Sequence, residues 1–195
     1  SRGLGDVYKR QLDMHVKLKL RSELPNILRG CNASGLMVTH DPQEAMSICD
    51  KVAVMNKGKI HQIDTPINLL NNPKTIFVSS FILGNNIINL KKSGNSVMSC
   101  LGEINSTGLS NNKHIKKMSI SPKFISIKKS KSGDAKVISK EFLGEFLIYK
   151  VSINDNILRV RTNINNLLNN GDKCSLSINK NSHYFLYPGA HKVYL

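Results

Sequence analysis

The sequence predicts an α/β layer over about residues 12–83, followed by a small all-β barrel or sandwich over about residues 84–195. Three observations support this prediction. Apolar residues recur at spacings of three and four over residues 12–29, which is the period of an amphipathic helix. A short apolar run, a helix start and a hairpin pattern then follow in close succession. Beyond Gly84, apolar and polar residues alternate in runs that Gly, Asn, Asp and Ser separate.

The first predicted element is a helix from Leu12 to Arg29, with basic residues on its polar side. Pro25 lies inside this pattern, where a proline removes a hydrogen-bond donor and clashes with the preceding turn. We therefore expect a kink or an early end near Glu23, with Gly30 as a stop signal.

A strand and a second helix are predicted next. The apolar run GLMVT at residues 35–39 is typical of a buried strand. Asp41 can act as the N-cap of the following helix, Pro42 fits its first position and Glu44 its third, as in a capping box. These capping functions explain Asp41 and Glu44, so we give neither residue a catalytic role.

A hairpin and two short helices complete the first part. The runs KVAVMN and KIHQID flank Lys57 and Gly58, a tight turn in which Gly58 can take a positive φ. Helices are expected over about residues 65–70 and, after Pro73, up to about Leu83. The boundary to the all-β part is expected at about residues 83–86.

Residues 1–11 (SRGLGDVYKRQ) show neither a periodic apolar face nor the apolar core of a signal peptide. We expect them to be a non-native leader and exclude them from the predicted fold. The longest apolar stretches, such as residues 76–83, are far shorter than the roughly 20 residues that a membrane-spanning helix needs.

The net charge of +15 is concentrated in the second part, which holds 17 basic and 6 acidic residues over residues 84–195. Such a balance is compatible with a nucleic-acid or anionic-lipid partner. It is also what scattered lysines on solvated strand faces produce, and we favour this second interpretation.

The cysteines and histidines are dispersed along the chain. No pair of cysteines forms a Cys-x-x-Cys motif, and no pair of histidines has the i, i+4 spacing of a helical metal site. We predict no metal site and reduced thiols, as in a cytoplasmic protein.

Two stretches resemble a known family. LDMHVKLKLRSEL at residues 12–24, together with residues 35–86 from GLMVTHD onward, looks like the end of the ATPase domain of ABC importers for ferric iron, polyamines, sulfate and sugars. ISPKFISI and KEFLGEFLIYKV, at residues 120–127 and 140–151, resemble the transport-associated OB domain that follows in these subunits. The resemblance implies an α/β remnant of a P-loop ABC ATPase domain over residues 12–83 and an all-β OB-like regulatory domain over residues 84–195.

The resemblance also implies the function of the intact subunit, an ABC-type ATPase that energises import. Two copies would close over ATP and Mg²⁺ and drive transmembrane permease subunits, which receive solute from a periplasmic binding protein. The location would be the cytoplasmic face of the bacterial inner membrane, as a peripheral protein. The tail HYFLYPGAH resembles iron-type subunits, so ferric iron is the first expectation for the cargo, with spermidine, sulfate and sugar left open.

The chain departs from the family pattern at the nucleotide site. It contains no Gly-x-x-x-x-Gly-Lys-Ser/Thr loop, LSGGQ signature, Q-loop or Walker B Asp-Glu pair. We therefore expect the chain by itself neither to bind ATP tightly nor to hydrolyse it, and we expect these motifs to lie upstream of Asp13 in the intact gene.

His40 and Asp13 are the two candidate site residues. In MVTHD, His40 matches the switch histidine of the family, which implies a contact to the γ-phosphate of ATP; without the resemblance, a lone histidine after a strand is more often structural. Asp13 matches the end of the D-loop, which implies that it reaches the partner's phosphate loop across the dimer. Its alternative role is to complement a helix dipole.

A basic OB-fold protein that binds single-stranded nucleic acid is the rival class. Phe142, Phe146 and Tyr149 lie near Lys140 and Lys150, a mixture that can stack bases and contact phosphates. Alternation makes core packing the favoured role for most of these rings. The resemblance at residues 12–86 also counts against this class, so we predict no nucleic-acid partner.

Overall fold

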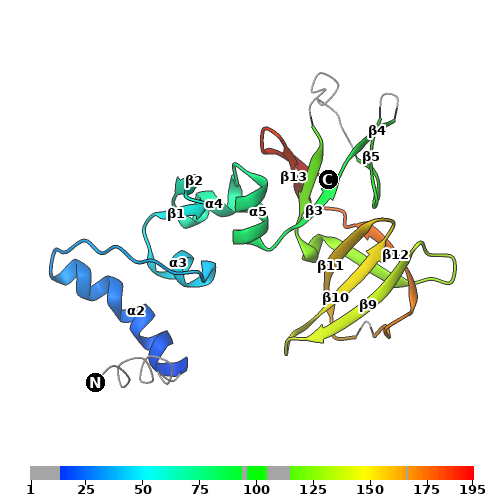
Figure 1. Cartoon of the computed structure of the whole chain (residues 1–195). Coiled ribbons are helices and arrows are strands. Elements are labelled where there is room, and N and C mark those ends of the chain that lie inside the picture. Colours follow the sequence, from blue (N-terminus) through cyan, green and yellow to red (C-terminus); the bar gives the residue numbers. More distant parts are fainter. Residues whose placement is uncertain (1–13, 94–95, 105–114, 166) are drawn as a thin grey trace. The chain divides into compact units, whose positions relative to one another are not determined.

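The computed structural model describes residues 14–93, 96–104, 115–165 and 167–195. The chain forms two compact units, one ending at Asn68 and one spanning Leu69–Leu195 (Figure 1). Most elements are strands, which confirms the β-rich character predicted for the second part.

From residue 14 onward, the first unit contains two helices and one hairpin, and a further helix begins at its end. The elements are α2 Met14–Gly30, α3 Pro42–Ile48, β1 Val52–Asn56, β2 Lys59–Asp64 and α4 Pro66–Asn71.

Helix α2 runs past Pro25 to Gly30, so the early end expected near Glu23 is wrong. The helix closes with the hydrogen-bond pattern of a Schellman motif, because Ala33 N–H donates to the Leu28 carbonyl at 2.9 Å and Asn32 N–H to the Arg29 carbonyl at 3.1 Å. Asn32, with φ of 50°, takes the left-handed conformation that such an end requires. The helix thus ends at Gly30, the predicted stop residue, and Asn32 makes the turn that follows.

The segment GLMVT does not form the predicted buried strand. Residues 33–39 belong to no helix or strand, and the side chains of Leu36 and Val38 are 95% and 91% exposed. A strand needs a neighbour to take up its backbone hydrogen bonds. Within the described residues none pairs with this segment, so its apolar composition alone does not bury it.

The hairpin β1–β2 agrees with the prediction. The strands are antiparallel, and Asn56 faces Lys59 across the turn. Both turn residues have positive φ, 48° at Lys57 and 73° at Gly58. This is the requirement of a type I′ turn, whose twist matches that of the flanking strands.

The second unit begins with the last residues of α4 and with α5, Ile76–Leu83. Thr75 caps α5 at its start, and Gly84, with φ of 63°, ends it in the left-handed conformation. Within the described ranges, twelve strands and one 3-10 helix follow: β3 Asn86–Asn89, β4 Lys91–Ser93, β5 Ser96–Ser99, β6 Gly102–Ile104, β7 Lys117–Ile120, η1 Pro122–Phe124, β8 Ile125–Lys129, β9 Ala135–Phe142, β10 Phe146–Ile153, β11 Asn156–Asn163, β12 Lys173–Ile178, β13 His183–Tyr187 and β14 His191–Tyr194.

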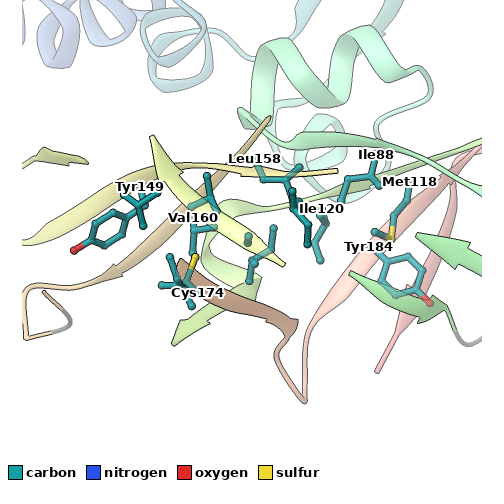
Figure 2. Close-up of a cluster of buried hydrophobic side chains, with 14 of the residues drawn as sticks. Ile88, Met118, Ile120, Tyr149, Leu158, Val160, Cys174 and Tyr184 are labelled. Atoms are coloured by element: carbon teal, nitrogen blue, oxygen red, sulfur yellow. The ribbon is translucent and has the colours of Figure 1, made fainter. Parts of the chain in front are cut away.

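These strands form three sheets around one core. Their orders are β11-β10-β9-β12-β8, β14-β13-β7-β3 and β4-β5-β6. Figure 2 shows the apolar cluster, to which the sheets contribute in common; its labelled members are Ile88, Met118, Ile120, Tyr149, Leu158, Val160, Cys174 and Tyr184. The arrangement is consistent with the expected OB-like domain.

The residues after Gly84 connect two of these sheets. The side chain of Asn86, the first residue of β3, pairs with the backbone of Arg159 in the edge strand β11. Its Nδ2 donates to the Arg159 carbonyl and its Oδ1 accepts from the Arg159 N–H, both at 2.8 Å. An asparagine amide therefore occupies the place that a neighbouring strand would otherwise take.

The segment before residue 84 also contributes to the second unit. The Tyr187 hydroxyl of β13 donates to the Pro73 carbonyl at 2.7 Å, and Ser79 of α5 hydrogen-bonds to Ser119 of β7. The domain boundary predicted at residues 83–86 stays a prediction, while the compact unit extends back to Leu69.

The extent of the second unit can be tested by truncation. We expect a fragment of residues 69–195 to be more stable than one of residues 84–195, by about 2 kcal/mol, because the shorter fragment leaves the buried Tyr187 hydroxyl without its Pro73 partner and removes the Ser79 bond to Ser119. Urea unfolding followed by circular dichroism measures the difference. Equal midpoints for the two fragments would show that α5 contributes nothing.

A single buried hydroxyl gives a second test of this core. Tyr149 is fully buried, and its oxygen accepts from the Leu168 N–H at 2.9 Å. Tyr149→Phe should lower the free energy of unfolding by about 1–3 kcal/mol, because a buried donor loses its partner. Tyr194→Phe, on a side chain that is 69% exposed, is the matched control and should change it little. Urea midpoints of the full chain measure both.

Candidate functional site

His40 lies between the extended segment and helix α3, at a turn whose two neighbouring residues are fixed. Asp41 N–H donates to Thr39 Oγ1 at 3.0 Å, and Thr39 Oγ1 donates to Glu44 Oε2 at 2.6 Å. The Thr39 side chain therefore spans His40 and links the Asp41 backbone to Glu44 of helix α3. The His40 side chain itself is exposed and makes no hydrogen bond to the described residues.

Asp41 caps helix α3 as predicted. Its Oδ1 accepts from the N–H groups of Gln43 and Glu44 at 2.9 and 3.4 Å. The second half of the capping box is different, because the Asp41 N–H donates to the Thr39 hydroxyl, which in turn donates to Glu44. Thr39 stands between them and relays the interaction, which explains why a threonine precedes His40.

The arrangement presents one imidazole on a rigid turn, next to a helix start, and does not form a complete binding site. The other candidate, Asp13, lies outside the described residues. Among the described residues no three His, Cys, Asp or Glu side chains come together as a metal site. None of the described helices has the length and apolar character to cross a membrane.

The three aromatic residues considered for stacking bases are dispersed by the fold. Tyr149 is buried, and the face of the Phe146 ring is covered by the Arg161 guanidinium at 3.7 Å. Phe142 is 64% exposed at the end of β9. These side chains do not form a continuous platform for stacking successive bases.

The second unit contains a polar network that the sequence did not indicate. Asn85 Nδ2 donates to Ser79 Oγ and Ser119 Oγ, at 3.2 and 3.1 Å, and the two hydroxyls hydrogen-bond to each other. Burial raises the pKa of Tyr187, whose hydroxyl donates to the Pro73 carbonyl, to about 12, and the nearby Ser79 hydroxyl opposes this rise. In the described part of the chain, Asn85 Oδ1 is the one buried side-chain atom without a partner.

A cavity of about 340 Å³ lies beside this network. The described residues that line it combine apolar, aromatic and polar side chains, and Lys123 is the charged one among them: Leu70, Asn71, Ile82, Leu83, Asn85, Ser121, Lys123, Phe124, His183 and Phe185. The sequence signals for it were weak, because the lining residues are widely separated along the chain.

Comparisons with known proteins find relatives for part of the chain. Over about 40% of its length, its homologues are ATP-binding subunits of ABC importers. No family model matches the chain.

The matched proteins are named for polyamine import. The chain is 48% identical over 77 residues to the spermidine/putrescine import ATP-binding protein PotA of Bacillus thuringiensis (strain Al Hakam), and equally so to PotA of Bacillus anthracis. It is 43% identical over 76 residues to PotA of Trichormus variabilis. These matches cover 40% and 39% of the chain, and the chain spans 24% and 20% of the length of the relatives. The expectation of ferric iron finds no support in these names.

A histidine in the wall of the cavity generates a prediction about pH. His183 packs edge-on against Phe124, and burial lowers its pKa below 6.5, with Lys192 and Lys123 acting in the same direction. The unfolded chain therefore takes up the proton more readily than the folded chain. Stability that is fully present above pH 6.5 should be lost as the pH falls from there through the lowered pKa.

Urea midpoints measured between about pH 7.5 and about pH 5 test this expectation. His183→Leu should make the decline shallower, and His191→Gln, on the neighbouring strand, is the control. A decline of equal slope in the wild type and His183→Leu would contradict the expectation.

Proposed function

We propose that the chain is part of the ATP-hydrolysing subunit of a bacterial ABC importer, and that the cargo of this importer is a polyamine. The observation that carries the proposal is the 48% identity over 77 residues to subunits named for spermidine and putrescine import. The motif MVTHD at residues 37–41 and the fixed turn around His40 support it.

In this proposal the two parts of the chain have different roles. Residues 12–83 are the remnant of the P-loop ATPase domain, and residues 84–195 form the transport-associated OB domain that regulates it. The antiparallel sheets and shared core of the second unit support the latter role. The exposed apolar segment at Leu36 and Val38 supports the former, because such a run normally occupies the interior of a parallel sheet.

His40 is the proposed switch histidine. The Thr39 side chain links the Asp41 backbone to Glu44 and so fixes the turn that carries His40. The His40 imidazole is exposed on this turn and can contact a ligand. In the complete subunit it would contact the γ-phosphate, and Asp13 would approach the partner's phosphate loop. Positioning and charge stabilisation dominate phosphoryl transfer, so one such contact can be essential for turnover.

The residues of this chain fit ATP and Mg²⁺ only in part. They offer one exposed imidazole, and the sequence has no phosphate loop whose amides could cradle the phosphates. These residues by themselves therefore do not make a site for ATP hydrolysis. The proposed partners are a second copy of the subunit and the membrane permease, at the cytoplasmic face of the inner membrane.

A chimera tests the proposal. The upstream part of Bacillus anthracis PotA, joined at its D-loop to residues 12–195 of this chain, should hydrolyse ATP. His40→Ala in the chimera should nearly abolish turnover and leave ATP affinity largely unchanged, because the ground-state contacts to the nucleotide lie elsewhere. His191→Ala is the matched control. Turnover and nucleotide affinity are measured on the same preparation.

The outcomes separate the parts of the proposal. A folded chimera that binds ATP and does not hydrolyse it would remove the ATPase assignment. Full turnover in His40→Ala would remove only the role of His40. Uptake of labelled spermidine by cells that lack their own PotA tests the cargo, and rescue of ferric iron uptake without spermidine uptake would contradict the polyamine assignment.

A further inference from the structure

The outer face of the five-stranded sheet carries a dense group of cations, called here the basic face. It consists of exposed side chains from five consecutive strands: Lys128, Lys136, Lys150, Arg159, Arg161 and Lys173. Their inward-pointing neighbours, such as Val151, Leu158 and Val160, are core residues. The strand alternation therefore places the charges together on the side opposite the core.

The register of the sheet puts like charges directly opposite each other. Lys150 faces Arg159 across β10 and β11, and Lys136 faces Lys173 across β9 and β12. Like charges in directly opposed positions destabilise a sheet. None of the six forms an ion pair with any residue that the structure describes. Composition accounts for many lysines, but it does not account for their pairing in opposed positions.

Such an arrangement is stabilised when an anion binds between the cations, because the repulsion present in the free protein is then neutralised. The spacing of these cations matches an extended polyanion. Side chains on one face of a strand recur at about 6.8 Å, as Arg159 and Arg161 do, and neighbouring strands are about 4.8 Å apart. An acidic chain laid across the strands could contact several of these cations in turn.

The face fits an acidic protein segment better than other polyanions. A twisted sheet turns by about 20–25° per strand, so a flat bilayer could not contact β8 and β11 at once. Stacking of bases needs an open ring, and the Phe146 ring is covered by Arg161. A second copy of the same face is excluded by its like charge. Ile157, 68% exposed beside this group, adds an apolar contact of the kind found in protein interfaces.

We propose that the basic face binds an acidic, extended segment of a partner protein. This inference goes beyond the importer proposal and does not depend on it. It also carries a consequence for stability. The opposed cations lower the stability of the free protein and provide the contacts to the partner. Removing one cation of each pair should therefore raise the stability of the fold and lower the affinity for the partner.

The test uses the full chain and a fluorescein-labelled oligo-glutamate peptide. The double variant Lys136→Thr/Lys150→Thr removes one cation from each opposed pair and places a residue with high β-propensity in each strand. We expect its melting temperature to rise and its affinity for the peptide, from fluorescence anisotropy, to fall about tenfold. Lys92→Thr, on strand β4 of another sheet, is the control and should leave affinity unchanged.

Competing ligands decide the partner class. Labelled oligo-dT and vesicles of phosphatidylglycerol in phosphatidylcholine are measured at the same physiological ionic strength, and we expect both to bind more weakly than the peptide. Tighter binding of oligo-dT would replace the proposal with a nucleic-acid surface, and binding to the vesicles alone would replace it with a membrane surface. Unchanged peptide affinity and melting temperature in the double variant would overturn it.

Discussion

The hydrogen bonds of two consecutive asparagines fix how the parts of the second unit meet. Asn85 donates to Ser79 of α5 and to Ser119 of β7, while Asn86 pairs with the backbone of β11. One short junction thus connects a helix, the four-stranded sheet and the five-stranded sheet. Buried amides of this kind are worth little net energy when satisfied and are costly when left without partners, so they act mainly by excluding other arrangements.

The features that the sequence predicts well are those that depend on neighbours along the chain. The cap at Asp41, the turn at Lys57 and Gly58 and the end of α5 at Gly84 each follow from one or two residues and their φ preferences. Whether GLMVT at residues 35–39 forms a strand depends instead on a partner strand, and the composition of the segment does not show whether one is present. The order β11-β10-β9-β12-β8 likewise rests on contacts between distant residues.

The candidate site likewise has features that the sequence predicts and features that it does not. The position of His40 beside a helix start follows from its sequence, and the structure adds that Thr39 links the cap to Glu44. The network of Asn85, Ser79 and Ser119 and the opposed cations of the basic face could not be predicted, because both exist only once strands are in register. Lys150 and Arg159 alternate with apolar residues like ordinary surface positions, and the sequence does not show that they face each other.

The pairing of Asn86 with Arg159 has a consequence for the effect of slow deamidation on the protein. A primary amide offers a donor and an acceptor in the geometry of a peptide group, so at Arg159 it takes up the outward backbone groups of β11 as a strand would. Deamidation to aspartate would replace the donor with a second acceptor facing the Arg159 carbonyl. The edge would then be open to a strand from another molecule, and slow chemical change at one side chain would become a route to intermolecular β-association.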